Sequence, residues 1–179
     1  DLGNLDEMLA YFAPCNGIIF DVRDNGGGTL TYAERIAARF TNEKVHTGYI
    51  MHKTGPGHNQ FSQPKPVYVE PSNRIRWQKP VAVLTNRSAY STTNEFANIM
   101  RYMPNAVLIG DRPGGGAGLP FTSELPNGWG VRFSASPHLD AEKNHIEFGI
   151  EPDIKIDLTS LTLHDDIIEE ARKTLKNMQ

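Results

Sequence analysis

Short apolar runs alternate with helical patterns through the middle of the chain, and this alternation limits the folds open to it. Residues 17–22, 80–85 and 106–109 are rich in branched side chains and are short enough to be buried strands. Amphipathic helical patterns cover residues 31–40 and 92–103, after the first and the second of these runs. Because strands that alternate with helices are typical of parallel sheets, the sequence predicts an α/β fold.

The rest of the chain adds elements around this alternation. Its 179 residues are enough for one domain with a buried core. The first residue is Asp1 and not methionine, so we expect the chain to be part of a longer protein. The remaining expected elements are a helix over 5–12, an irregular excursion over 41–78 with one or two weak strands such as 45–51, a hairpin at Asn127-Gly128, a strand over 154–157 and a helix over 163–175.

Charge and composition argue against several classes of protein. The basic residues are scattered and the net charge is -3, so neither a nucleic-acid partner nor a polybasic membrane anchor is expected. No apolar run approaches the ~18 residues that a membrane-spanning helix needs. The single cysteine, Cys15, can form neither an intramolecular disulfide nor a cysteine-based zinc site.

Three consecutive glycines, Gly26, Gly27 and Gly28, follow the first expected strand. Glycine lets the backbone approach a bound group and point N–H groups at it, as in phosphate and oxyanion sites. The alternative is a tight turn between strand and helix. This turn lacks the third glycine of a dinucleotide motif, and the second glycine cluster, 114–118, is followed by Leu119 instead of the Lys-Ser/Thr of a P-loop. We therefore expect no nucleotide cofactor at either cluster.

Ser91 lies where the turn after the second expected strand meets the next helix. A hydroxyl at a helix N-terminus is exposed, and the helix dipole favours negative charge that develops beside it. The alternative is structural, because Thr92 and Glu95 have the spacing of a helix-capping box. The G-x-S-x-G frame of a nucleophile elbow is missing. The local pattern thus leaves both a catalytic and a capping role open.

The histidines show no spacing typical of a metal site. No two of them lie four residues apart, and there is no H-E-x-x-H motif, so no metal is expected. Each histidine is interpreted as a surface or loop residue. They are His46, His52, His58, His138, His145 and His164.

Four motifs, taken in order, resemble those of the tail-specific, or C-terminal-processing, serine peptidases. They read FDVRDNGGG at 20–28, VLTNRSAYS at 83–91, GDRPGGG at 110–116 and EFGIEPD at 147–153. This family is related to the tricorn protease core and to interphotoreceptor retinoid-binding protein. The resemblance extends over about residues 17–156, which is most of the chain.

The resemblance implies a ClpP/crotonase-like core, in which ββα units wind into a superhelix, and hydrolysis of a peptide or protein substrate without a cofactor. By position, Ser91 matches the nucleophile that forms the acyl-enzyme. The backbone N–H groups of Thr92 and of Gly27 or Gly28 match the oxyanion hole. Such donors contribute about 10²–10³ each to the rate in related chemistry.

The resemblance leaves the general base to be identified. Many family members use a lysine about two dozen residues after the serine, but this chain has Gly116 there. The tricorn-like branch instead uses an upstream histidine oriented by a downstream glutamate, which Glu147 matches better than Glu151. The sequence thus suggests a Ser-His-Glu arrangement whose histidine would precede Asp1, with His145 as the fallback within the chain.

Two other functions remain open beside the peptidase. One is a catalytically inactive module that binds a ligand or peptide on the same fold, which the missing lysine favours. The other is an acyl-CoA enzyme of the crotonase type, for which the chain offers no clear basic site. The family resemblance further suggests a protein of the bacterial cell envelope, periplasmic or secreted.

Overall fold

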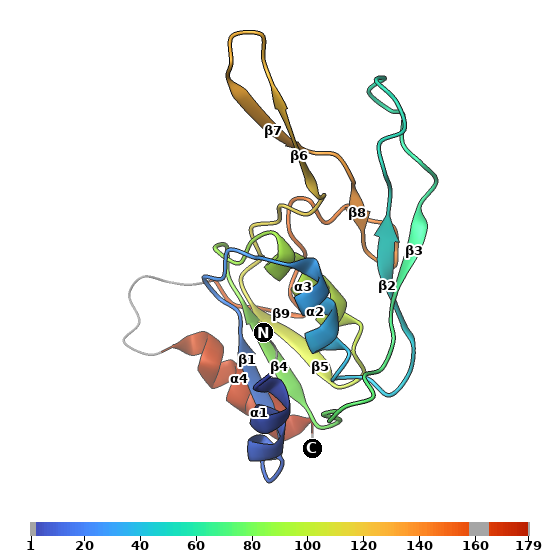
Figure 1. Ribbon diagram of the computed structural model, residues 1–179. Helices are drawn as coiled ribbons and strands as arrows, with labels where there is room; N and C mark the ends of the chain where they lie inside the picture. The colour runs from blue at the N-terminus through green and yellow to red at the C-terminus, as the bar shows by residue number, and fades with distance from the viewer. Residues whose placement is uncertain (1–2, 158–164, 179) are drawn as a thin grey trace.

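A four-stranded parallel sheet forms the centre of the protein. The computed structural model describes residues 3–157 and 165–178 of the chain. The strands pair in the order β1-β4-β5-β9, and every pairing is parallel, which confirms the predicted α/β fold (Figure 1). The four strands are β1 (Ile18–Asp21), β4 (Val81–Thr85), β5 (Ala106–Gly110) and β9 (Ile154–Lys155).

Both faces of this sheet are covered, which explains why the inner strand β4 is apolar from Val81 to Leu84. All residues of β4 are buried. Successive side chains point to opposite faces, so Val83 packs in the larger core, while Leu84 packs in the smaller core against helix α4. The helices are α1 (Leu5–Phe12), α2 (Leu30–Ala37), α3 (Thr92–Arg101) and α4 (Asp166–Asn177).

Two antiparallel units extend beyond the central sheet. The first is a three-stranded sheet in the order β3-β2-β8, and the second is the isolated hairpin β6–β7. Both rise from the same end of the molecule, above the start of α3 in the view of Figure 1. Their strands are β2 (Val45–Ile50), β3 (Lys65–Val69), β8 (His138–Leu139), β6 (Pro120–Glu124) and β7 (Gly130–Ser134).

The prediction of strands within 41–78 and of a hairpin at Asn127-Gly128 is confirmed. Strand β2 ends one residue before the expected end, and the hairpin turn has Gly128 at φ +84°, a backbone conformation that favours glycine. The short strand β8 pairs with β2, which the sequence pattern did not reveal.

The helices end earlier than their apolar patterns predict. Helix α2 was expected to reach Phe40, but it ends at Ala37 and continues as a tighter turn in which Phe40 N–H donates to the Ala37 carbonyl. Helix α3 ends at Arg101 in the same way, since Met103 N–H donates to the Met100 carbonyl.

Helix α4 begins with a side-chain cap. The Oδ1 atom of Asp165 accepts a hydrogen bond from the Ile168 N–H at 3.1 Å. The expected start at residue 163 lies outside the described residues. None of the helices within the described ranges is long and apolar enough to cross a membrane.

Candidate active site

Ser91 has a backbone conformation that is rare outside glycine. It is the N-cap of α3, with φ 58° and ψ -125°, and its side chain makes no capping hydrogen bond. Its N–H donates to the Gly115 carbonyl at 2.7 Å, and the preceding N–H of Tyr90 donates to the Asn25 carbonyl at 3.0 Å. Two glycine-rich turns, distant in sequence, therefore hold this serine in its strained conformation.

The capping-box interpretation of this turn is wrong. Thr92 Oγ1 donates to the Gly28 carbonyl at 2.7 Å and thus ties α3 to the first glycine turn. Glu95, the other half of the expected box, instead contacts the Nδ1 atom of His138 through its Oε1 atom. The residues at the start of α3 therefore bind neighbouring segments instead of capping their own helix.

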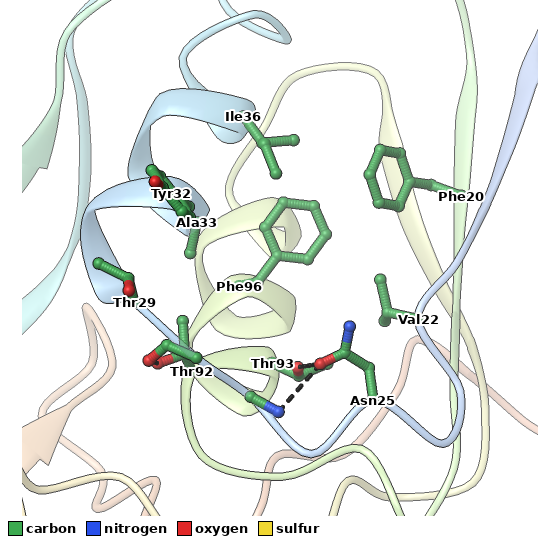
Figure 2. Close-up of a pocket in the computed structure, with 12 residues that line it drawn as sticks. Phe20, Val22, Asn25, Thr29, Tyr32, Ala33, Ile36, Thr92, Thr93 and Phe96 are labelled. Carbon is green, nitrogen blue, oxygen red and sulfur yellow. Dashed lines mark hydrogen bonds between the residues drawn. The ribbon is translucent and has the colours of Figure 1, made fainter. Parts of the chain in front are cut away.

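The first glycine turn packs directly against Ser91. A Cβ atom added to Gly27 would lie 2.8 Å from Ser91 Cβ and 2.9 Å from Thr92 N. The Gly27 N–H itself donates to Asn25 Oδ1 at 2.9 Å (Figure 2). In the described part of the chain neither the N–H of Gly28 nor that of Thr92, the first residue of α3, has an acceptor. Of the two glycines proposed as oxyanion donors, Gly28 is thus the one whose N–H is available.

Glu147 is held on the far side of the second glycine turn. Its carbonyl accepts the Gly116 N–H at 2.8 Å, and its Oε1 atom accepts the Ser134 hydroxyl at 2.9 Å. In the same turn, the Gly115 carbonyl accepts the Ser91 N–H. The structure therefore brings both predicted catalytic residues to one glycine turn.

A lysine in place of Gly116 would require the Tyr90 ring to move and would be strained in its backbone. A Cβ atom at this position would lie 2.2 Å from Cζ of the Tyr90 ring, and the backbone there has φ +78°. The ring therefore fills the space in which a longer side chain would begin. This contact gives a steric reason for the missing lysine.

The structure separates the histidines that the sequence could not rank. His145 is exposed, and in the described part of the chain it makes no hydrogen bond to Ser91 or Glu147. His138 is only 6% exposed, so its interpretation as a surface or loop residue is wrong. It lies on β8 and lines a cavity that also contains Ser91. No sequence signal marks it, because its contact with Glu95 arises only from the tertiary fold.

Two cavities of different character lie beside the turn that contains Gly28. An apolar cavity of about 210 Å³ lies between α2, α3 and β1, with Tyr32, Ile36, Phe96 and Phe20 around it (Figure 2). A polar cavity of about 150 Å³ lies on the other side. Both are bordered by Gly28 and Thr92. Residues lining the polar cavity include Ser91, Glu95, Arg132, His138 and the segment 116–120.

The Glu34 carboxyl lies near Glu95 and His138 and is affected by them. Burial raises the pKa of Glu34 above its usual range, and the negative charge of Glu95 raises it further, while His138 acts in the opposite direction. The side chains of Glu34, Glu95 and His138 all line a third cavity. Across residues 3–157 and 165–178 no cluster of three or more His, Cys, Asp or Glu side chains could hold a metal ion.

Comparisons with known proteins agree on one family. The model of peptidase family S41 matches residues 2–156. A solved structure from Parabacteroides merdae is 56% identical, with a TM-score of 0.93, and the match covers 98% of this chain and 56% of that one. The chain thus spans about half the length of this relative.

More distant relatives share the fold. The carboxyl-terminal-processing peptidase 2 of Arabidopsis thaliana chloroplasts is 27% identical over 144 residues, which cover 77% of this chain and 25% of that protein. The structure of mature CPAF is 16% identical, with a TM-score of 0.80, and the match covers 97% of this chain and 45% of that one. At that identity the similarity concerns the fold alone.

Proposed function

The chain belongs to peptidase family S41, and from this premise we propose that the protein containing it is a serine endopeptidase that acts through an acyl-enzyme on Ser91. The observation that carries the proposal is the conformation of Ser91, at φ 58° in the N-cap position of α3. Strained backbone conformations of this kind concentrate at catalytic sites. Gly28 and Thr92, whose N–H groups have no acceptor among the described residues, line the polar cavity together with Ser91.

In the proposed mechanism, Ser91 Oγ attacks the carbonyl carbon of the scissile peptide while a general base removes its proton. The oxyanion that forms accepts hydrogen bonds from the N–H groups of Gly28 and Thr92. The C–N bond then breaks, and the base returns the proton to the leaving amine. Water then attacks the acyl-enzyme carbonyl by the same steps, which releases the carboxylic acid and restores Ser91.

We propose that the base is a histidine from outside this chain and that Glu147 orients it. Support comes from Glu147, which the Ser134 hydroxyl and the Gly116 N–H hold beside the turn that binds Ser91. The overlap of a side chain at position 116 with the Tyr90 ring argues against a Ser-Lys pair. His145 remains the fallback within the chain.

The substrate proposed is a polypeptide with an apolar residue beside the scissile bond. The apolar cavity borders the oxyanion donors and has room for one aliphatic or aromatic side chain. The name of the Arabidopsis relative, a carboxyl-terminal-processing peptidase, supports cleavage near the C-terminus of the substrate.

A catalytically inactive module that binds peptides is the second candidate. It is favoured by one observation, that no described histidine or lysine makes a hydrogen bond to Ser91. The two candidates differ in whether Ser91 is nucleophilic in the full-length protein.

A fluorophosphonate probe applied to the full-length protein separates these candidates. We expect stoichiometric labelling that disappears in Ser91→Ala and persists in the matched control Ser88→Ala, whose side chain is exposed in the preceding turn. Absence of labelling in folded wild-type protein would overturn the peptidase and favour the binding module.

A further inference from the structure

The helix that presents Ser91 is tied to the chain segment that leads to Glu147. Glu95 lies one turn after Ser91 on α3, and its N–H donates to the Ser91 carbonyl at 3.2 Å. The Oε1 atom of the Glu95 side chain contacts the Nδ1 atom of His138 on β8. The two side chains are 11% and 7% exposed, so the contact lies in the protein interior. One residue thus joins the backbone of the proposed nucleophile to strand β8.

The same segment then runs from β8 to Glu147. The His138 carbonyl accepts the Ile146 N–H at 3.3 Å, and Ile146 directly precedes Glu147. A second bond runs beside it, because Asn94 Nδ2 donates to the Ile146 carbonyl at 3.0 Å. Asn94 and Ile146 are both buried. Two adjacent residues of α3 therefore bind the segment that leads to Glu147, and both contacts lie in the interior.

The direct route between the proposed nucleophile and Glu147 passes through glycine. The Gly115 carbonyl accepts the Ser91 N–H, and the Gly116 N–H donates to the Glu147 carbonyl. The two glycines have φ +83° and +78°, and glycine has the least restricted backbone of all residues. A turn of this kind restrains the distance between its neighbours less than a helix or a strand does. The buried contacts of α3 thus add a second and more rigid link between Ser91 and Glu147.

We propose that Glu95 and His138 are positioning residues that set the distance between Ser91 and Glu147 in the full-length protein. This inference rests on the proposed peptidase function, in which Glu147 orients the base that takes the Ser91 proton. A misplacement of about 1 Å between reacting groups can cost about 10² in rate. The contact therefore acts on the reaction through the geometry of Ser91 and Glu147, and it needs no bond to the substrate.

The chemistry of the pair suits this role better than a role in stability. A buried carboxylate and imidazole lose their hydration, and a buried polar pair is often no more stabilising than apolar side chains of the same volume. The contact of the Glu95 carboxylate with His138 is directional, however, because it holds one carboxylate oxygen against one ring nitrogen. Apolar packing in the same place would hold α3 against β8 without fixing the offset between them.

The test measures steady-state kinetics and the rate of fluorophosphonate labelling in the full-length protein. In Glu95→Ala we expect kcat and the labelling rate to fall by about tenfold or more, with KM changed by less than about twofold, because the change affects the reacting groups and not the binding of substrate. Glu95→Gln keeps an oxygen that accepts the Nδ1–H of His138 and should restore kcat to within about threefold of the wild type. His138→Asn, whose amide N–H groups lie near the Nδ1 position, should be more active than His138→Ala for the same reason.

Asn98→Ala is the matched control. Asn98 is a buried residue one turn further along α3, and its Nδ2 atom donates to the Thr47 carbonyl on β2 at 3.0 Å. The variant thus breaks a buried contact of the same helix that does not lead to Glu147. Asn98→Ala should lower the melting temperature as Glu95→Ala does, but leave kcat within about twofold of the wild type.

If Glu95→Ala does not fold, the double variant Glu95→Leu/His138→Leu decides the question, because it replaces the pair with apolar side chains. It should be about as stable as the wild type and still lose about tenfold in kcat. Equal losses of kcat in Glu95→Ala and Asn98→Ala, or a loss confined to KM, would overturn the positioning role and leave the peptidase standing. Wild-type protein that is folded but neither labelled nor active would overturn the peptidase and this role with it.

Discussion

At the scale of single residues, the nucleophile is positioned by backbone contacts that only glycine permits. Gly27 has φ +102°, and a Cβ atom there would lie 2.7 Å from the Tyr90 carbonyl oxygen as well as close to Ser91. Nothing in this contact can yield, because the neighbouring atoms are backbone or belong to Ser91 itself. The geometry of the nucleophile therefore depends on a hydrogen atom at position 27.

We predict that Gly27→Ala abolishes labelling of Ser91 while the protein remains folded. The added methyl group must displace Ser91 or Thr92, and loss of one oxyanion donor alone costs about 10²–10³ in rate. Gly26→Ala is the matched control, because a Cβ atom there meets nothing within 4 Å. Labelling rates and thermal unfolding of both variants give the comparison, and equal labelling by the two would contradict the packing argument.

Glu34 provides a prediction for the pH dependence of stability. Burial, and then Glu95, raises the pKa of its carboxyl, so the folded state favours the protonated form. Its stabilising contribution is present below the pKa of the unfolded chain and is lost as the pH rises through the raised pKa. Glu34→Gln should therefore increase the melting temperature at about pH 7 and have little effect near about pH 4.

The size of this effect is limited by solvent. Glu34 is partly exposed, so a gain of only a few tenths of a kcal/mol is expected in the free energy of unfolding. The exposed Glu124→Gln should show no such pH-dependent difference. Thermal unfolding at the two pH values measures this difference. An increase in the melting temperature of Glu34→Gln that is as large in acid as at neutral pH would contradict a raised pKa of Glu34.

The residues of the site divide into those with a sequence signal and those without. Ser91, Gly28 and Glu147 occur in motifs whose order resembles a known family, because they act through fixed local backbone geometry. Glu95 and His138 carry no such signal. Their contact joins α3 to β8, and only the tertiary fold brings these elements together.

At the scale of elements, the apolar periodicity located the strands and helices that are buried. The central strands were predictable because both of their faces are covered, which leaves continuous apolar runs. The ends of the helices were less predictable, because α2 and α3 finish in tighter turns that keep apolar residues such as Phe40 and Met103 buried. Strand β8 has two residues, too few to produce a pattern.

The hairpin β6–β7 links an exposed element to the site. All residues of β6 are exposed, but Ser134 at the base of β7 donates to Glu147 Oε1 at 2.9 Å. We predict that Ser134→Ala reduces kcat of the full-length protein by about five- to tenfold, the equivalent of one exposed hydrogen bond of about 1 kcal/mol, with little change in KM. Stability should be nearly unchanged, because the side chain is exposed.

Ser123→Ala is the control for this hairpin. Ser123 lies on the paired strand away from Glu147, opposite Val131, and is also exposed. Steady-state kinetics of both variants distinguish an orienting role of Ser134 from a general effect on the hairpin. An equal loss in the two variants would point to the hairpin as a whole.

At the scale of the whole molecule, the described residues bring together the proposed nucleophile, oxyanion donors and orienting carboxylate, while the proposed base comes from elsewhere. We predict that the isolated 179-residue chain folds but does not hydrolyse peptides that the full-length protein cleaves. Circular dichroism checks the fold, and peptide hydrolysis checks the activity. Robust turnover by the isolated chain would show that the base lies within it, with His145 the first residue to substitute.

The packing of Tyr90 against Gly116 also restricts how such an enzyme can change its chemistry by mutation. Gly116→Lys would place a side chain against the Tyr90 ring, which is half exposed and would have to turn away, and would put lysine at φ +78°. A lysine at this position would therefore need a rearrangement of the ring as well as a strained backbone.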